Sequence, residues 1–106
     1  MSDFLGMMKK AAQLQSKMKE LQDELDLVEV EGVSGGGMVR VRMTAKNDVK
    51  TVKIDPSLMK EGDGDILEDL LVTALGDARR KAEAEMQSRM QGLAGGLGLP
   101  PGLGLT

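Results

Sequence analysis

The sequence lacks several residue types that commonly carry catalytic or metal-binding chemistry. It has no cysteine, histidine, tryptophan or tyrosine, and Phe4 is its one phenylalanine. These absences exclude disulfides, zinc-finger sites, haem ligation by His or Cys, and nucleophile–base pairs built on either residue. The lack of cysteine also fits a reducing compartment.

Long hydrophobic runs are missing as well. No stretch approaches the roughly 20 apolar residues of a membrane span, and the opening MSDFLGMMKK has no apolar run of signal-peptide length. We therefore predict a cytosolic protein with no membrane partner. At 106 residues one domain is expected, with a modest core that dimerisation would enlarge.

Charge is sorted into blocks along the chain, although the net value is only −3. Residues 1–19 carry +3, residues 20–31 carry −6, residues 32–54 carry +4, residues 55–77 carry −6 and residues 78–91 carry +2. The local field matters more than the total for attracting a polyanion. An acidic net charge therefore does not exclude a nucleic-acid partner.

The strongest pattern is an uninterrupted apolar stripe in the first quarter of the chain. Its members alternate in steps of four and three residues: Met7, Ala11, Leu14, Met18, Leu21, Leu25 and Val28. This a/d repeat predicts a long helix, which we expect to begin near Ser2 or Asp3. Because so long a stripe must be buried, it needs the second helix, a second copy of the chain, or both.

After Leu27 the apolar period changes to two. The runs 28–31, 38–44 and 49–54 alternate, with glycines and Lys46-Asn47-Asp48 between them, and predict a three-stranded antiparallel meander. One face is expected to hold Val28, Val30, Val39, Val41, Met43, Val52 and Ile54. The other places Glu29 and Glu31 beside Arg40, Arg42 and Lys53, so we assign these bases to cross-strand pairs rather than to a nucleic-acid surface.

The remaining segments complete an α+β expectation. Asp55-Pro56-Ser57-Leu58 predicts a short helical turn, and Asp65 with Glu68 predicts the start of a second long helix. The stripe of that helix thins after Ala78, so its second half is expected to project as an arm. The uncharged Gly/Leu/Pro segment 92–106 predicts a flexible tail after a single domain, 1–91, and whether its leucines dock stays open.

Two further motifs contain residue types that ligand sites use, but each lacks part of the required pattern. Gly35–Gly37 is not followed by the Lys-Ser/Thr and helix of a phosphate loop. Glu61, Asp63 and Asp65 lack the length and distal glutamate of a calcium loop. We therefore predict no catalytic residues, cofactor, metal or small-molecule substrate, and a protein that is not an enzyme.

The basic segments are the start of the first helix and the end of the second. If the two helices pack antiparallel, these segments become neighbours and can contact DNA phosphates without reading bases in detail. The alternative is a structural or adaptor dimer whose acidic and Met-rich surfaces hold another protein.

Specific sequence motifs also carry a resemblance over nearly the whole chain: IDPSL at 54–58, LEDL at 67–70 and DARRK at 77–81, with MMKKAAQLQSKMKELQDEL before them and LPPGL after. In this order they resemble the YbaB/EbfC family of bacterial nucleoid-associated proteins. The resemblance implies a homodimer centred on its strands, with helices as tweezer-like arms that bind duplex DNA with limited sequence preference. It further implies a place in the cytoplasm and nucleoid and a role in nucleoid organisation and gene regulation. Carried over by position, the candidate DNA contacts are Lys9, Lys10, Lys17, Arg79, Arg80, Lys81 and Arg89.

Overall fold

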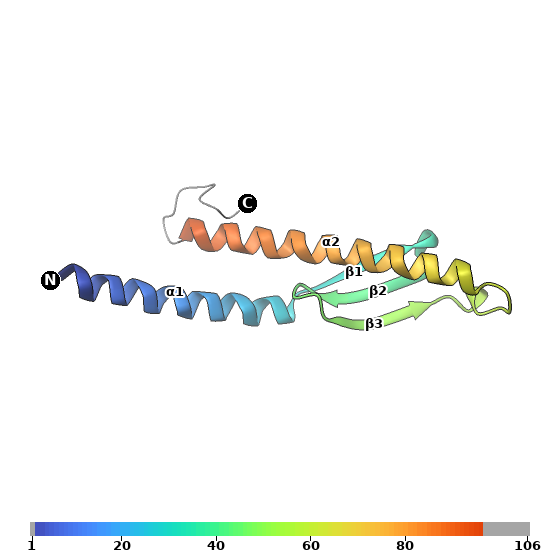
Figure 1. Cartoon of the computed structure of the whole chain (residues 1–106), viewed down its shortest axis with the longest axis horizontal. Coiled ribbons are helices and arrows are strands. Elements are labelled where there is room, and N and C mark those ends of the chain that lie inside the picture. Colours follow the sequence, from blue (N-terminus) through green and yellow to red (C-terminus); the bar gives the residue numbers. More distant parts are fainter. Residues whose placement is uncertain (1, 97–106) are drawn as a thin grey trace.

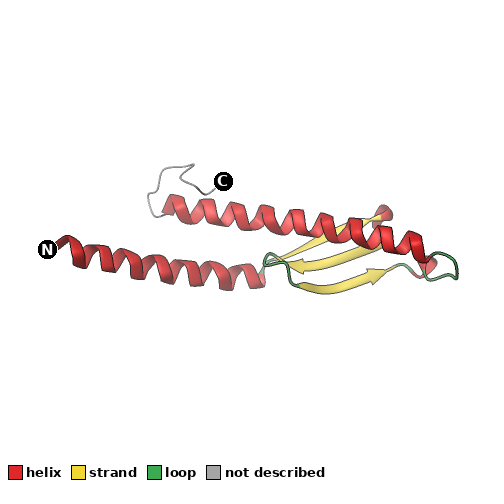
Figure 2. Cartoon of the chain, viewed as in Figure 1, coloured by secondary structure: helices red, strands yellow, loops and turns green. Residues whose placement is uncertain are grey.

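The computed structural model describes residues 2–96 and is an elongated molecule of 73 × 23 × 16 Å. Its elements are α1 (Ser2–Leu27), β1 (Glu29–Ser34), η1 (Gly35–Gly37), β2 (Val39–Thr44), β3 (Val49–Ile54), η2 (Pro56–Leu58) and α2 (Gly64–Gly96). The sheet lies at one end, and α1 leads away from it while α2 runs back over it (Figures 1 and 2). The predicted α+β order of a helix, a three-stranded meander, a short turn and a helix is confirmed.

The helices begin and end close to the expected residues, with two differences. Asp63 precedes α2 and its carbonyl accepts a 3.0 Å hydrogen bond from the Leu67 N–H, so the expected cap, Asp65, lies within the first turn. At its far end α2 continues to Gly96, so residues 92–96 are helical where the sequence predicted a tail. Packing of Leu93 against α1 gives this glycine-rich end an apolar contact. The rest of the predicted tail, 97–106, lies outside the described residues.

The sheet has the order β1-β2-β3, and both neighbouring pairs are antiparallel. The predicted cross-strand ion pairs are confirmed for the two arginines: Arg40 lies 2.8 Å from Glu31, and Arg42 lies 3.7 Å from Glu29. The prediction is wrong for Lys53, whose neighbour across the strands is Arg40. The predicted turn between β2 and β3 is also present, with Asn47 at a φ of 71°. Asparagine tolerates this left-handed conformation better than most residues do.

A column of alanines on α2 covers the first two strands. Ala74, Ala78 and Ala82 are fully buried and join a cluster with Val39, Val41 and Met43 of β2. Small side chains let the helix axis approach the sheet closely, and β1 contributes Gly32 at the contact. A Cβ at Gly32 would stand 2.7 Å from the Ala78 Cβ, closer than any real pair of these atoms.

The two edges of the sheet differ in their protection. At β1, the N–H of Val33 donates to the Asp77 carboxylate at 3.0 Å, and the carbonyl of Glu31 accepts from Lys81 Nζ at 2.7 Å, so α2 caps this edge. β3 has no such cover from the described residues, and its side chains Val49 and Val52 are 49% and 45% exposed. The expected continuous apolar face is therefore only partly buried, because α2 lies over β1 and β2 and does not reach β3.

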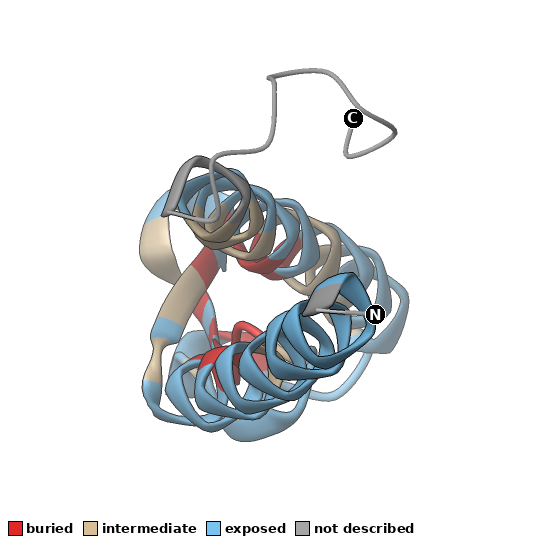
Figure 3. Cartoon of the chain, turned by 90° about the vertical axis from the view of Figure 1, so that its left-hand side faces the viewer, coloured by how far each residue is buried: buried red, intermediate tan, exposed pale blue. Residues whose placement is uncertain are grey.

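A second, separate core joins the two helices beyond the sheet. Leu21, Leu25 and Ala45 are buried there, and the side chains packed on them include Met86, Met90 and Leu93. Figure 3, viewed along the molecule, shows the buried residues on the sides of the helices that face each other. The later half of the predicted seam thus packs within the subunit, while its first half extends past the end of α2.

Candidate nucleic-acid interface

The free end of α1 is a basic rod. Residues 3–19 contain one acid, Asp3, and the four lysines Lys9, Lys10, Lys17 and Lys19, all of them exposed. Within residues 3–93, Lys9, Lys10 and Lys19 have no carboxylate at ion-pair distance, so their charges are directed to solvent. Most of this segment projects past α2, which leaves it accessible to a long polyanion (Figure 1). We call residues 3–19 the arm tip.

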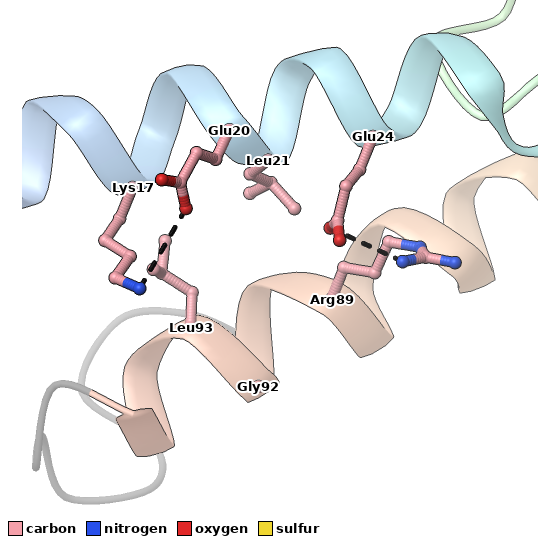
Figure 4. A pocket seen from close by; sticks show the side chains of 7 residues that line it. All are labelled: Lys17, Glu20, Leu21, Glu24, Arg89, Gly92 and Leu93. Carbon is pink, nitrogen blue, oxygen red and sulfur yellow. Dashed lines mark hydrogen bonds and ion pairs between the residues drawn. The ribbon is translucent and has the colours of Figure 1, made fainter.

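Lys17 and Arg89 both lie where the arm tip meets the end of α2. They line one hollow of about 230 Å³ together with Glu20, Leu21, Glu24, Gly92 and Leu93 (Figure 4). Lys17 lies 3.9 Å from Glu20, whereas Arg89 lies 3.4 Å from Glu24 and 3.7 Å from Glu85. Arg89 is therefore balanced by two acids, and its strongest role in the described chain is to tie α2 to α1.

The Arg79-Arg80-Lys81 cluster sits elsewhere, on the part of α2 that covers the sheet. Lys81 is 3.1 Å from Asp77 and caps the Glu31 carbonyl, and Arg80 is 3.9 Å from the same aspartate. Arg79 is exposed, with no acid at ion-pair distance within residues 3–93. Of the three, Lys81 thus has a structural contact that competes with any contact to DNA.

The structure brings only part of the predicted site together. Lys17 and Arg89 line the same hollow, which agrees with the antiparallel packing of the helices expected from the sequence. Arg80 is nine residues from Arg89 along α2, and Lys9 is a further 15 residues from Glu24 along α1. At ~1.5 Å per residue these steps place Lys9 roughly 35 Å from Arg80. The seven predicted residues therefore form an arm tip and a distant sheet-side group, not one patch.

Four exposed lysines outside the predicted set also face solvent, one of them Lys60 in the loop after η2. Lys19 belongs to the arm tip, while Lys50 and Lys53 lie on β3. None of them has a carboxylate at ion-pair distance within residues 3–93. The sequence places Lys53 opposite acids in the sheet, but its cross-strand partner is Arg40, which already pairs with Glu31. Only the strand register reveals that Lys53 is left without an acid.

Two carboxyl groups have lowered pKa values, and both have structural causes. The pKa of Asp77 is lowered mainly by the hydrogen bond from the Val33 N–H and then by Lys81. The pKa of Asp55, the N-cap of η2, is lowered mainly by the hydrogen bond from the Ser57 N–H. Neither carboxyl group lines the hollow at Arg89.

The described residues contain no cluster of three side chains that could hold a metal ion, and this includes Glu61, Asp63 and Asp65. Among the same residues, no helix has the length and apolar character that a membrane span requires.

Comparisons with known proteins identify the family. The model of the YbaB/EbfC DNA-binding family matches residues 1–97. A nucleoid-associated protein of Nitrobacter hamburgensis is 75% identical over 105 residues, covering 99% of both chains. One of Bradyrhizobium diazoefficiens is 77% identical over 103 residues, covering 97% of both.

The fold also occurs in a distant solved structure. A crystal structure of an uncharacterized protein from Helicobacter pylori superposes with a TM-score of 0.74 at 21% identity, over 82% of this chain and 91% of that one.

The matched family is described by DNA binding and not by a reaction, which supports the prediction that the protein is not an enzyme. The family model and the near full-length relatives agree, and the chain belongs to the YbaB/EbfC DNA-binding family.

Proposed function

We propose that this protein is a nucleoid-associated protein that binds duplex DNA as a homodimer, with low sequence specificity, through the basic tips of its helical arms. The observation that carries the proposal is the charge distribution along α1. Exposed lysines dominate the part that projects past α2, and apart from Asp3 the acids of α1 begin at Glu20, where α2 starts to cover the helix. Binding of this kind suits a role in nucleoid organisation and gene regulation.

The chemistry of the arm tip favours backbone contacts over base reading. Its cations are all lysines, and no arginine lies among residues 1–19. Lysine acts as a point charge toward phosphate, whereas arginine makes the commonest specific contact to guanine in the major groove. We therefore place Lys9, Lys10 and Lys17 at the centre of the interface. Arg79, Arg80, Lys81 and Arg89 are secondary contacts, because three of them already pair with acids.

The open side of the sheet supports a dimer. An exposed strand edge with apolar side chains is a template for pairing, and β3 offers Val49, Val52 and an edge that the described residues leave uncovered. The opposite edge is blocked by Asp77 and Lys81. A two-fold axis near β3 would join two subunits at their sheets and leave both arm tips free.

The test is the salt dependence of DNA binding by the full chain. Fluorescence anisotropy with two unrelated labelled duplexes should give similar affinities for both. If about four phosphates are neutralised, the slope of log K against log salt is about −3.6, and affinity falls roughly 150-fold between 50 and 200 mM salt. A strong preference for one duplex would overturn the low specificity.

The same titration separates the competing adaptor function. An apolar contact to a protein partner is insensitive to salt, and a protein of that class would not bind either duplex. Absence of binding at low salt would therefore reject the DNA-binding proposal for this chain. A dimer that binds DNA with a slope near zero would reject the arm tip as the contact surface.

A further inference from the structure

The arm tip carries an apolar stripe that no described residue covers. The seam of α1 is covered from Met18 onward by Met86, Met90 and Leu93 of α2. Earlier members of the same stripe are exposed: Phe4 by 64%, Met7 by 68% and Leu14 by 43%. The apolar repeat continues along α1, but α2 covers only its later part. We call the uncovered residues Phe4, Met7, Ala11 and Leu14 the α1 stripe, and we expect another segment to pack on them.

The segment that follows α2 in the same chain begins beside this stripe. The last described residues of α2 lie beside the start of the uncovered stretch, since Gly92 and Leu93 line a hollow with Lys17 and Leu21 (Figure 4). Residues 97–106 follow directly. Ten residues span up to ~33 Å when extended, whereas Lys17 and Phe4 are 13 residues apart on a helix, or ~20 Å. The segment is long enough to run the whole length of the stripe.

The composition of residues 97–106 matches the surface. The segment LGLPPGLGLT has four leucines and no charged side chain, so its burial desolvates no ionised side chain. Pro100 and Pro101 favour an extended polyproline II backbone and reduce the entropy lost on docking. A further hollow on α1, lined by Asp3, Gly6, Met7 and Lys10, offers space for a side chain near the tip.

We propose that residues 97–106 dock along α1 of the same chain and cover the α1 stripe, where α2 no longer reaches the seam. The cover leaves the basic surface available. In heptad terms Lys9 lies opposite the seam, and Lys10 and Lys17 lie on its flank. The proposal is independent of DNA binding and adds an interaction that stiffens the arm.

The absence of tryptophan and cysteine makes the test direct. Phe4→Trp places a single indole on the stripe, and its emission reports burial. This variant is compared with one that also carries Leu97→Ser, Leu99→Ser, Leu103→Ser and Leu105→Ser. We expect emission at shorter wavelength with the native tail and a shift to longer wavelength with the serine tail, at every protein concentration. Circular dichroism checks that both proteins keep their helices.

Two outcomes of the emission experiment would overturn the proposal. Emission typical of full exposure with the native tail would show that nothing covers the stripe. Short-wavelength emission that survives the serine tail would show that a second copy or another segment covers it.

A disulfide pair then tests whether the cover comes from the same chain. Met7→Cys with Leu103→Cys should oxidise within one chain, so that a non-reducing gel shows single subunits with no free thiol. Covalent dimers in place of the intrachain bond would reject docking within the chain.

Discussion

Gly32 of β1 lies directly beneath Ala78 of α2, so closely that a Cβ on Gly32 would come 2.7 Å from the Ala78 Cβ and 2.5 Å from its backbone nitrogen. It would also meet the carbonyl oxygen of Ala74. Two of these neighbours are backbone atoms that cannot rotate away. The contact sets the distance between helix and sheet, and it explains why the alanine column can be completely buried.

Gly32→Ala should therefore destabilise the protein. Forcing a methyl group into a tightly packed site costs about 1–3 kcal/mol of the free energy of unfolding, which urea denaturation measures. Gly6→Ala is the matched control, because nothing lies within 4 Å of its added Cβ and the residue is helical. It should stabilise by about 1 kcal/mol. Equal effects of both variants would contradict the close approach.

Charge reversal at the arm tip should weaken DNA binding without affecting folding. Lys9→Glu with Lys10→Glu removes two exposed cations per subunit, so affinity should fall at least tenfold and the salt slope should become shallower by several units in a dimer. The control is Lys53→Glu with Lys60→Glu, which makes the same change in net charge away from the arm tip and from the Val52 face of β3; analytical ultracentrifugation checks that both variants keep the same oligomeric state. If both pairs weaken binding equally, net charge and not the arm tip determines affinity.

A charged residue on the open face of β3 should disrupt the proposed dimer. Val52 pairs with Val41 across the sheet and so shares its apolar face, but is 45% exposed in the single subunit. Val52→Asp should therefore leave the fold intact and lower the mass measured by analytical ultracentrifugation to that of one subunit. Thr51→Asp, on the other face of the same strand, should change nothing. A Val52→Asp protein that stays dimeric would exclude this face as the interface.

Asp77 should contribute a pH-dependent part of the stability. Its pKa in the folded chain is lowered from the ordinary value of 3.8, so the stabilisation is complete well above that value and is lost as the pH falls through the folded pKa. Asp77→Asn keeps an oxygen that can accept from the Val33 N–H but cannot ionise. The stability difference between the two proteins should be largest at neutral pH and shrink below about pH 4. A constant difference would show that the charge of Asp77 plays no part.

Lys81 should act on stability more than on DNA. Lys81→Met keeps the aliphatic stem and removes the hydrogen bond to the Glu31 carbonyl, at a cost of about 0.5–1 kcal/mol. DNA affinity should change less than twofold. Arg79→Met, on the exposed neighbour without an acid, should leave the thermal midpoint unchanged. The reverse result, with loss of affinity at Lys81 and no loss of stability, would assign Lys81 to the DNA interface.

Much of the fold follows from local pattern in the sequence. The a/d repeat of α1 and the change of period after Leu27 specify the elements, because side-chain periodicity determines which face can be buried. The alternation of Glu29 and Glu31 with Arg40 and Arg42 was sufficient to predict the ion pairs across the sheet. The excess of lysine at the arm tip is likewise a property of the sequence.

Other features depended on long-range packing that local pattern does not encode. The path of α2 over β1 and β2 leaves Val52 exposed, although its alternation is that of a buried strand. The same path gives Lys81, a predicted DNA contact, a hydrogen bond to the edge of β1, because the carbonyl of Glu31 lies within reach only in the folded chain. The sequence alone thus determined the elements and the distribution of charge. The tertiary structure decided which apolar surfaces are covered and which cations are free, since both depend on residues far apart in the chain.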